Sequence, residues 1–337
     1  MGRYIIRRLL QFIPTVLGAM FLLNYMTSIG IQLTGNPVRA LFGDRTPTQS
    51  QLVAAAAKYH LDDSCLTQKF NPCLGTFWDR LQSIFLHWDF GITLTSRRPV
   101  WDVMVERFPN TTRLAVLAIV IEIVIGIVAG VIAGLRHDSF WDNLVKVTTV
   151  FAISVPVFVL GAAVRTFVGG VLGKWMRGES WIPELVSSGI FNGQYKAGYP
   201  WASLIIPAFV LATLSLATTA RLTRTSLMEN MRADYVRTAK AKGLRTRRVV
   251  GVHTLRNSLI PVITFLGVDF ATLLSGAVVT ERIFNVPGVG SLIARSAVTG
   301  DPATVLGVTT FLVMIFLVVN LLVDILYAVL DPRIRYE

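Results

Sequence analysis

Four ionisable side chains lie inside long apolar runs of the sequence, where a charge is costly to hold. They are Glu122, Arg165, Asp269 and Asp324. A charge in such a setting marks either a polar pathway or an ion pair with a neighbouring segment or subunit. For Asp269 the ion pair is the simpler interpretation. Arg165 lies near the end of its run, from which its long side chain can reach water. Asp324 could pair with a basic residue between 221 and 256, and Glu122 could pair between subunits.

The sequence offers few other groups for chemistry. It has two cysteines, no CxxC pair and four histidines, so we expect no zinc or haem site. The nearest fragment of a phosphate-binding loop is Gly173-Lys174. The motif G-x-x-x-x-G-K-[ST] needs Ser or Thr where Trp175 lies and a glycine where Val168 lies. We therefore expect no catalytic residue, no metal site and no bound cofactor in this chain.

The composition indicates a membrane protein. Of 337 residues, 53% are hydrophobic and 15% are charged, whereas soluble domains carry about a quarter charged residues. The net charge of +12 would suit nucleic acid, but base-reading motifs are absent and the Lys and Arg residues lie between apolar runs. That distribution is typical of the positive-inside bias of membrane proteins.

Six runs are long enough to cross a bilayer, which takes about 20 apolar residues. The prolines inside them are compatible with helices in a bundle, so we predict an all-α integral membrane fold. The first run follows three arginines, as in a signal peptide, but it exceeds the usual length of roughly 7–15 residues and no A-x-A-like site follows. We interpret it as a retained anchor. The six predicted spans are Leu9–Ile31, Leu114–Leu135, Val147–Leu172, Trp201–Ala220, Leu259–Thr280 and Ala303–Leu330.

The charges flanking the spans predict that both termini are cytoplasmic. Arginines precede the first span, ten Lys or Arg lie between Arg221 and Arg256, and Arg333 and Arg335 follow the last span. Lys and Arg collect on the cytoplasmic side of short loops, whereas long external segments cross largely regardless of charge. The predicted domains are residues 1–31, an external segment 32–113, a core 114–330 with a cytoplasmic segment 221–258, and a tail 331–337.

Cys65 and Cys73 both fall in the predicted external segment. An oxidising compartment would allow them to form a disulfide across a short loop. Two free thiols remain the alternative, because the sequence does not give their geometry.

The cytoplasmic segment contains a short basic helix. Asp234 can cap a helix that begins at Tyr235, on which Tyr235, Val236 and Ala239 share one face. Gly243 falls where a left-handed C-terminal cap is expected. Such a helix suits docking in the groove of a partner, and equally suits resting on anionic lipid headgroups.

Several motifs extend over nearly the whole chain in a fixed order. Arg98-Pro99-Val100 and Pro109-Asn110-Thr111-Thr112 precede the second span, and Ser154 to Phe158 fall in the third. Glu281 to Gly290 follow the fifth span, and Asn320 to Tyr327 lead to Leu330 to Arg335. The strongest match is the basic helix itself, namely Asp234, Tyr235, Val236, Arg237, Thr238, Ala239, Lys240, Ala241, Lys242, Gly243 and Leu244. Together these motifs resemble the permeases of binding-protein-dependent ABC importers, in the dipeptide and oligopeptide branch, and specifically the first of their two permease subunits.

The resemblance implies a type I ABC importer permease in a bacterial inner membrane. It implies a second homologous permease, two ATP-binding subunits or domains that carry ATP and magnesium, and an extracytoplasmic binding protein as partners. The basic helix would be the coupling helix, with Ala239 and Gly243 at the contact with an ATPase subunit, and Asp269 could meet the ammonium terminus of a peptide. Nickel or haem are alternative cargoes, and a secondary transporter is the alternative class, although such transporters usually show two related halves. A receptor or scaffold would leave the docking helix unexplained.

Overall fold

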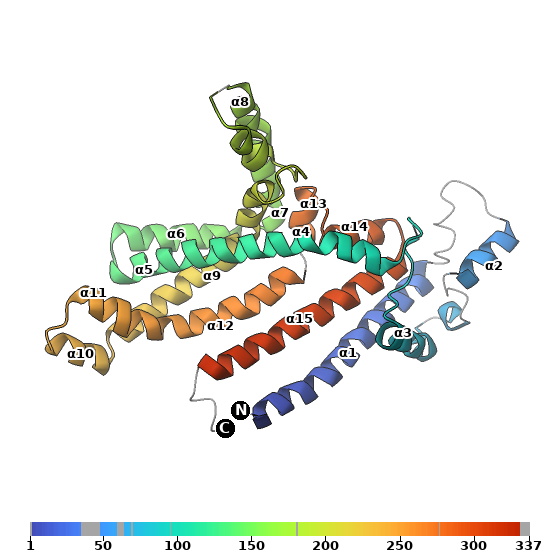
Figure 1. Cartoon of the computed structure of the whole chain (residues 1–337), viewed down its shortest axis with the longest axis horizontal. Coiled ribbons are helices and arrows are strands. Elements are labelled where there is room, and N and C mark those ends of the chain that lie inside the picture. Colours follow the sequence, from blue (N-terminus) through green and yellow to red (C-terminus); the bar gives the residue numbers. More distant parts are fainter. Residues whose placement is uncertain are drawn as a thin grey trace. The chain divides into compact units, whose positions relative to one another are not determined.

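The computed structural model describes residues 2–34, 48–58, 64–68, 70–94, 96–179, 181–275 and 277–330. These residues form helices joined by short connections, and no sheet occurs among them (Figure 1). They divide into two compact units. The first unit is Met1–Pro109 with Pro287–Glu337, and the second unit is Asn110–Val286. The predicted tail 331–337 lies outside the described residues.

The prediction of an all-α membrane fold with six spans is confirmed. Helices long and apolar enough to cross a bilayer cover Leu9–Gly30, Val100–Leu135, Val157–Gly178, Ala202–Met231, Thr246–Leu274 and Ala303–Ile325. The continuous third span Val147–Leu172 is wrong. The chain forms α6 (Phe140–Ser154), breaks at Pro156 and restarts as α7 (Val157–Val164). Proline disfavours helical backbone in the residue before it, and Val155 is accordingly extended, with ψ 120°.

In the first unit, α1 (Gly2–Thr34) and α15 (Pro302–Leu330) lie side by side (Figure 1). Their apolar faces meet α3 (Leu74–His87), the start of α4 (Val100–Ile121) and α14 (Val289–Val298). Asp301 caps α15 ahead of Pro302: its carboxylate accepts hydrogen bonds from the backbone N–H and the hydroxyl of Thr304. The same carboxylate accepts from the N–H of Leu94, at 2.8 Å. The cap therefore also holds the loop between α3 and α4.

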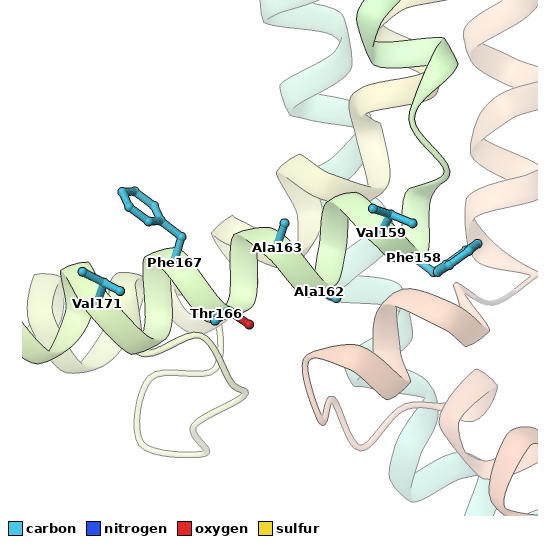
Figure 2. A pocket seen from close by; sticks show the side chains of 7 residues that line it. All are labelled: Phe158, Val159, Ala162, Ala163, Thr166, Phe167 and Val171. Atoms are coloured by element: carbon cyan, nitrogen blue, oxygen red, sulfur yellow. The ribbon is translucent and has the colours of Figure 1, made fainter.

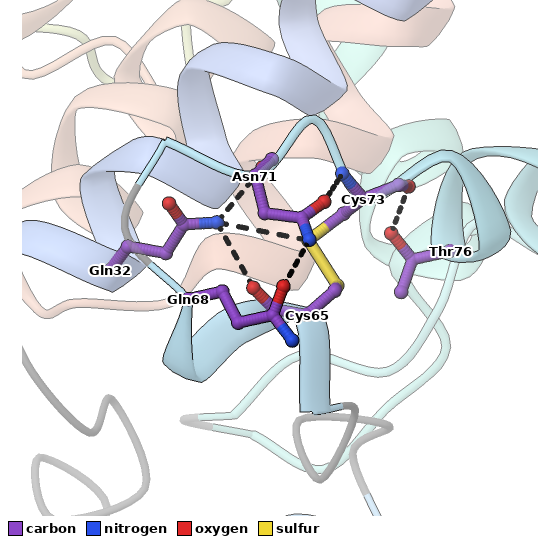
Figure 3. The surroundings of a disulfide bond; sticks show 6 residues. All are labelled: Gln32, Cys65, Gln68, Asn71, Cys73 and Thr76. Atoms are coloured by element: carbon purple, nitrogen blue, oxygen red, sulfur yellow. Dashed lines mark hydrogen bonds between the residues drawn. A yellow bond between two sulfur atoms is a disulfide. The ribbon is translucent and has the colours of Figure 1, made fainter.

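The segment that the sequence predicts to be external contains α2 (Gln49–Lys58) and the short helix η2 (Ser64–Thr67). A disulfide joins Cys65 and Cys73, whose Cα atoms are 5.4 Å apart (Figure 3). Gln32, near the end of α1, donates hydrogen bonds to the carbonyl oxygens of Cys65 (3.3 Å) and Asn71 (3.0 Å). The disulfide loop is thus fixed to the end of the first span.

The second unit is built around α9 (Ile205–Met231), which contacts α5 (Ile127–Leu135), α6 and α12 (Leu255–Leu274). Its closest neighbour is α5, across a seam of three glycines spaced four residues apart. A Cβ on Gly130 would lie 2.6 Å from the carbonyl oxygen of Ala220, and one on Gly126 would lie 2.9 Å from a Thr219 methyl. Gly134 lies opposite Leu227 in the same way. Small residues at this spacing let two membrane helices approach closely.

An ion pair ties α6 to α9 at the end of this seam. The fully buried Asp142 carboxylate accepts from Arg224 Nε at 2.5 Å and Nη2 at 2.9 Å, and Lys146 Nζ lies 2.9 Å from it. The bidentate guanidinium of Arg224 holds the pKa of Asp142 well below its usual range. Asp142 is therefore an anion at neutral pH, and its charge is compensated within the unit.

The glycine seam gives a first prediction. Gly130→Leu should strongly destabilise the chain, because its Cβ would meet backbone that cannot turn aside, and overpacking a tight contact costs about 1–3 kcal/mol or more. Gly18→Leu is the matched control, since Gly18 lies in an apolar span and a Cβ added there would meet nothing within 4 Å. The measurement is the thermal stability of the purified protein in detergent. Equal melting temperatures for the two variants would contradict the seam.

The disulfide gives a second prediction. Peptide mass mapping without reductant should recover Cys65 and Cys73 in one linked species, because the structure joins them in a loop that Gln32 of α1 holds in place. Reduction should loosen that loop, and proteolysis near residue 70 should then become faster. Two freely alkylated thiols in protein taken from intact cells would reject the bond.

Candidate functional site

The basic segment forms a helical hairpin between α9 and α12. The chain leaves α9 at Met231, forms α10 (Asp234–Ala241), turns at Gly243, and returns through α11 (Thr246–Arg248) and η8 (Val249–Thr254) (Figure 1). The predicted cap is wrong by one residue. Ala233 is the N-cap, with extended backbone and no side-chain cap, and Asp234 is the first helical residue. An acidic side chain there still stabilises the positive end of the helix.

The inner face of α10 is closed by the chain itself. Val236 is fully buried and Ala239 is 6% exposed, and both pack against Val249, with Leu244 at the edge. This differs from the prediction that Ala239 lies at a partner contact. The apolar stripe of such a short helix is needed to hold it on η8, because a helix of eight residues is not stable alone.

The outer face of α10 is open and basic. Tyr235 is 40% exposed, and Arg237, Lys240 and Lys242 are exposed with it. Gly243 has φ +73°, which confirms the predicted left-handed cap, and nothing lies within 4 Å of the position of a Cβ there. The N–H of Leu244 closes the turn on the carbonyl of Ala239 at 3.3 Å, as in a glycine-capped helix end. This face can receive a partner.

Two of the four predicted charges lie together in the second unit. Glu122 is fully buried (0% exposed) in the π-helical turn η3 (Glu122–Gly126), and accepts from the hydroxyl of Thr219 at 2.6 Å. Asp269 on α12 accepts from Ser215 at 2.9 Å. No local pattern in the sequence brings Glu122 and Asp269 together, because they are far apart along the chain and neither belongs to a recognised motif.

The other two charges have different settings. Arg165 begins the π-helical segment η4 (Arg165–Leu172), and its guanidinium donates to the carbonyl oxygen of Ile283 at 2.6 Å. It therefore fixes a backbone turn and does not merely reach toward water. Asp324 lies on α15 of the first unit, half-buried. Its pairing with the basic segment stays a prediction.

The turn that Arg165 holds belongs to a polar cluster that sequence reasoning missed. The buried Glu281 on α13 (Val278–Ile283) accepts from the hydroxyl of Thr111 at 2.7 Å. Tyr195 donates through its backbone N–H to the carbonyl of Phe284, and its hydroxyl contacts Asn110. Two of the sequence motifs, at 109–112 and 281–290, thus meet physically, although 170 residues separate Thr111 from Glu281.

One apolar face of the second unit has no cover from the described part of the chain. Figure 2 shows a shallow groove along α7 and η4, lined by Phe158, Val159, Ala162, Ala163, Thr166, Phe167 and Val171. Phe158 is 58% exposed and Phe167 is 63% exposed. In a membrane protein such a face contacts lipid or another subunit.

Comparisons with known proteins agree with these features. Residues 126–336 match the family model described as the inner membrane component of binding-protein-dependent transport systems. The chain is 33% identical, over the full length of both proteins, to the dipeptide transport system permease protein DppB of Escherichia coli K12. It is 33% identical to DppB of Haemophilus influenzae and 34% identical to a putative peptide transport system permease of Brucella abortus, again over both full lengths. With its six spans, the chain is a multi-pass protein of the bacterial inner membrane and belongs to the family of inner membrane components of binding-protein-dependent transport systems.

Proposed function

We propose that this chain is one permease subunit of an ATP-driven importer for peptides. The observation that carries the proposal is similarity over the full length to permeases named for dipeptide and peptide transport. The relatives give no support to a nickel or haem cargo or to a secondary transporter.

In this proposal, the chain binds no nucleotide, and ATP and magnesium are held by two partner subunits or domains. A second homologous permease completes the pathway, and an extracytoplasmic binding protein delivers the peptide. The apolar face along α7 and η4 is suited to the second permease, because its exposed Phe158 and Phe167 would be buried by another membrane helix.

The hairpin around α10 would transmit the movement of the ATPase. Val236 and Ala239 fasten α10 to η8, and η8 runs directly into α12. The hydroxyl of Ser258 on α12 also donates to the carbonyl of Ser226 on α9, at 3.3 Å. A push on the outer face of α10 therefore moves α9 and α12 together. Nucleotide binding can then bias two states of the permease that differ in which side is open.

The docking face gives a third prediction. Lys240→Glu should weaken the contact with an ATPase subunit, so that transport and peptide-stimulated ATP hydrolysis fall together by about tenfold, the effect of roughly 1.4 kcal/mol. Gly243→Val should act similarly, because a left-handed residue other than glycine costs roughly 1–2 kcal/mol. The control is Lys174→Glu, which makes the same charge change on α8 (Gly173–Gly178), on the opposite side of the membrane in the predicted topology.

The measurement is ATPase activity and peptide uptake in reconstituted vesicles, with assembly checked by size. If Lys240→Glu and Gly243→Val assemble and transport like Lys174→Glu, α10 is not the coupling element. Ala239→Asp is unsuitable for this purpose, because a charge at a buried site would disturb the hairpin itself.

The cargo gives a fourth prediction. Cells that lack this chain should lose uptake of a labelled dipeptide, and a plasmid-borne copy should restore it. Excess unlabelled peptide should compete with the label, whereas nickel ions and haem should not. Normal dipeptide uptake with loss of nickel or haem uptake would overturn the peptide assignment and leave the importer class intact.

A further inference from the structure

We propose that Glu122 and Asp269 form a proton-binding site inside the second unit, in which the two carboxyl groups share at least one proton. The site joins the second span to α9 and α12. It does not depend on which cargo the protein carries.

The geometry places the two carboxyl groups side by side. Their hydroxyl partners, Ser215 and Thr219, are four residues apart on α9 and so lie on one face, about one turn from each other. Ser215 donates to Asp269 Oδ1 and Thr219 donates to Glu122 Oε1. Because they bond to neighbouring turns of one helix face, the Glu122 and Asp269 carboxyl groups lie close enough to repel each other when both are charged.

Each carboxyl group keeps one oxygen without a donor. Glu122 Oε2 and Asp269 Oδ2 are both buried and accept no hydrogen bond from the described residues. A buried acceptor without a donor costs about 1–3 kcal/mol, and more when it is charged. Two neighbouring carboxylates would add mutual repulsion, which is why paired acids in other proteins share a proton and do not both ionise. One shared proton removes both penalties, because the protonated carboxyl then donates to the other carboxylate.

Among the described residues, no cation from the neighbouring helices replaces that proton. Arg224 on α9 is bonded to Asp142 of α6, and Arg165, after α7, is bonded to the carbonyl of Ile283. The remaining basic side chains on the elements that pack here make no ion pair with Glu122 or Asp269 within the part of the chain that the structure describes. They are Arg113 on α4, which is bonded to Asn110, Arg136 after α5, Lys146 on α6, Arg221 on α9, His253 on η8 and Arg256 on α12.

The site lies where protonation can matter to the fold. Glu122 belongs to a π-helical turn, an irregularity that often marks functional positions in helices. Asp269 and its partner Ser215 lie on the two helices that lead into and out of the α10 hairpin. Loss of the shared proton would leave two like charges facing each other between these helices, and would loosen their packing.

Infrared spectroscopy of the purified complex in D₂O tests the proposal. At neutral pH the unmodified protein should show the C=O band of a buried protonated carboxyl group, and this band should be lost as the pH is raised. Glu122→Gln/Asp269→Asn should lack the band. Each single variant should lose or shift the C=O band. The amide has the shape of the carboxyl group that it replaces, but it cannot share a proton with the remaining carboxyl group. Glu184→Gln, which removes an exposed acid near Lys196, should retain it unchanged.

Thermal stability gives a second readout. In the unfolded chain both carboxyl groups are exposed to water and lose their protons, whereas the folded site keeps one. The folded state therefore binds more protons, and its free energy of unfolding falls as the pH rises. The melting temperature of the unmodified complex should therefore fall more steeply than that of the double variant as the pH rises above about 4.3, the ordinary pKa of a glutamate in the unfolded chain.

Three results would overturn the proposal. The first is the absence of a protonated carboxyl band from the unmodified protein at neutral pH, a measurement that needs no variant. The second is a band that persists unchanged in Glu122→Gln. The third is a melting temperature that depends on sodium but not on pH, since a bound metal cation would then occupy the place of the proton.

Discussion

The close approach of α5 to α9 is the contact on which the second unit depends. Lipid offers no hydrophobic gain for bringing two apolar helices together, so their association rests on packing and on a few polar contacts. The glycines at 126, 130 and 134 remove the side chains that would hold the backbones apart. The hydroxyl of Thr219, beside Gly126, can then reach Glu122 one turn earlier on the same span. The seam thus sets both the packing and the position of the buried acid.

From this seam, α9 extends to the hairpin that contains α10. Its end at Met231 is only three residues from Asp234, and Ser226 is bonded to α12 beside it. A short helix such as α10 has little stability of its own, and it gains its place by burying Val236 and Ala239 on η8. The apolar face of α10 is therefore buried within the chain and is not available to a partner. Under the proposed function, an ATPase subunit would contact the exposed side, which carries Tyr235, basic side chains and the open backbone at Gly243.

The features that could be predicted from the sequence are those that depend on hydrophobic periodicity and composition. Six spans, the helix at residue 234 and the left-handed Gly243 follow from apolar run length and cap chemistry, which are local properties. The break at Pro156 escapes prediction because a proline inside a span is compatible with a helix when neighbours satisfy the freed groups, and the sequence does not show those neighbours. The burial of Ala239 could not be predicted either, because a small residue is equally suited to an intramolecular contact and to a docking surface.

Contacts between distant segments could not be read from the chain. Thr111 with Glu281, and Glu122 with Asp269, depend on how whole helices assemble, and each pair is more than 140 residues apart. The four-residue spacing of the glycines at 126, 130 and 134 is typical of helix pairs in membranes, but the spacing does not name α9 as the partner helix.

The buried acidic side chains of the second unit differ in how their negative charge is compensated. Asp142 on α6 lies against Arg224 of α9, and Lys146 of its own helix also reaches it. Its charge is therefore balanced by permanent cations. Glu122 and Asp269 contact the same helix at Thr219 and Ser215, five and nine residues before Arg224, where only hydroxyl groups of the described residues donate to them. A hydroxyl donates one hydrogen and carries no charge, so Ser215 and Thr219 satisfy half of the four carboxyl oxygens and neutralise neither group. The charge of the inner pair is then left to a mobile cation, and the proton is the smallest cation that can bridge two buried carboxyl oxygens without a donor.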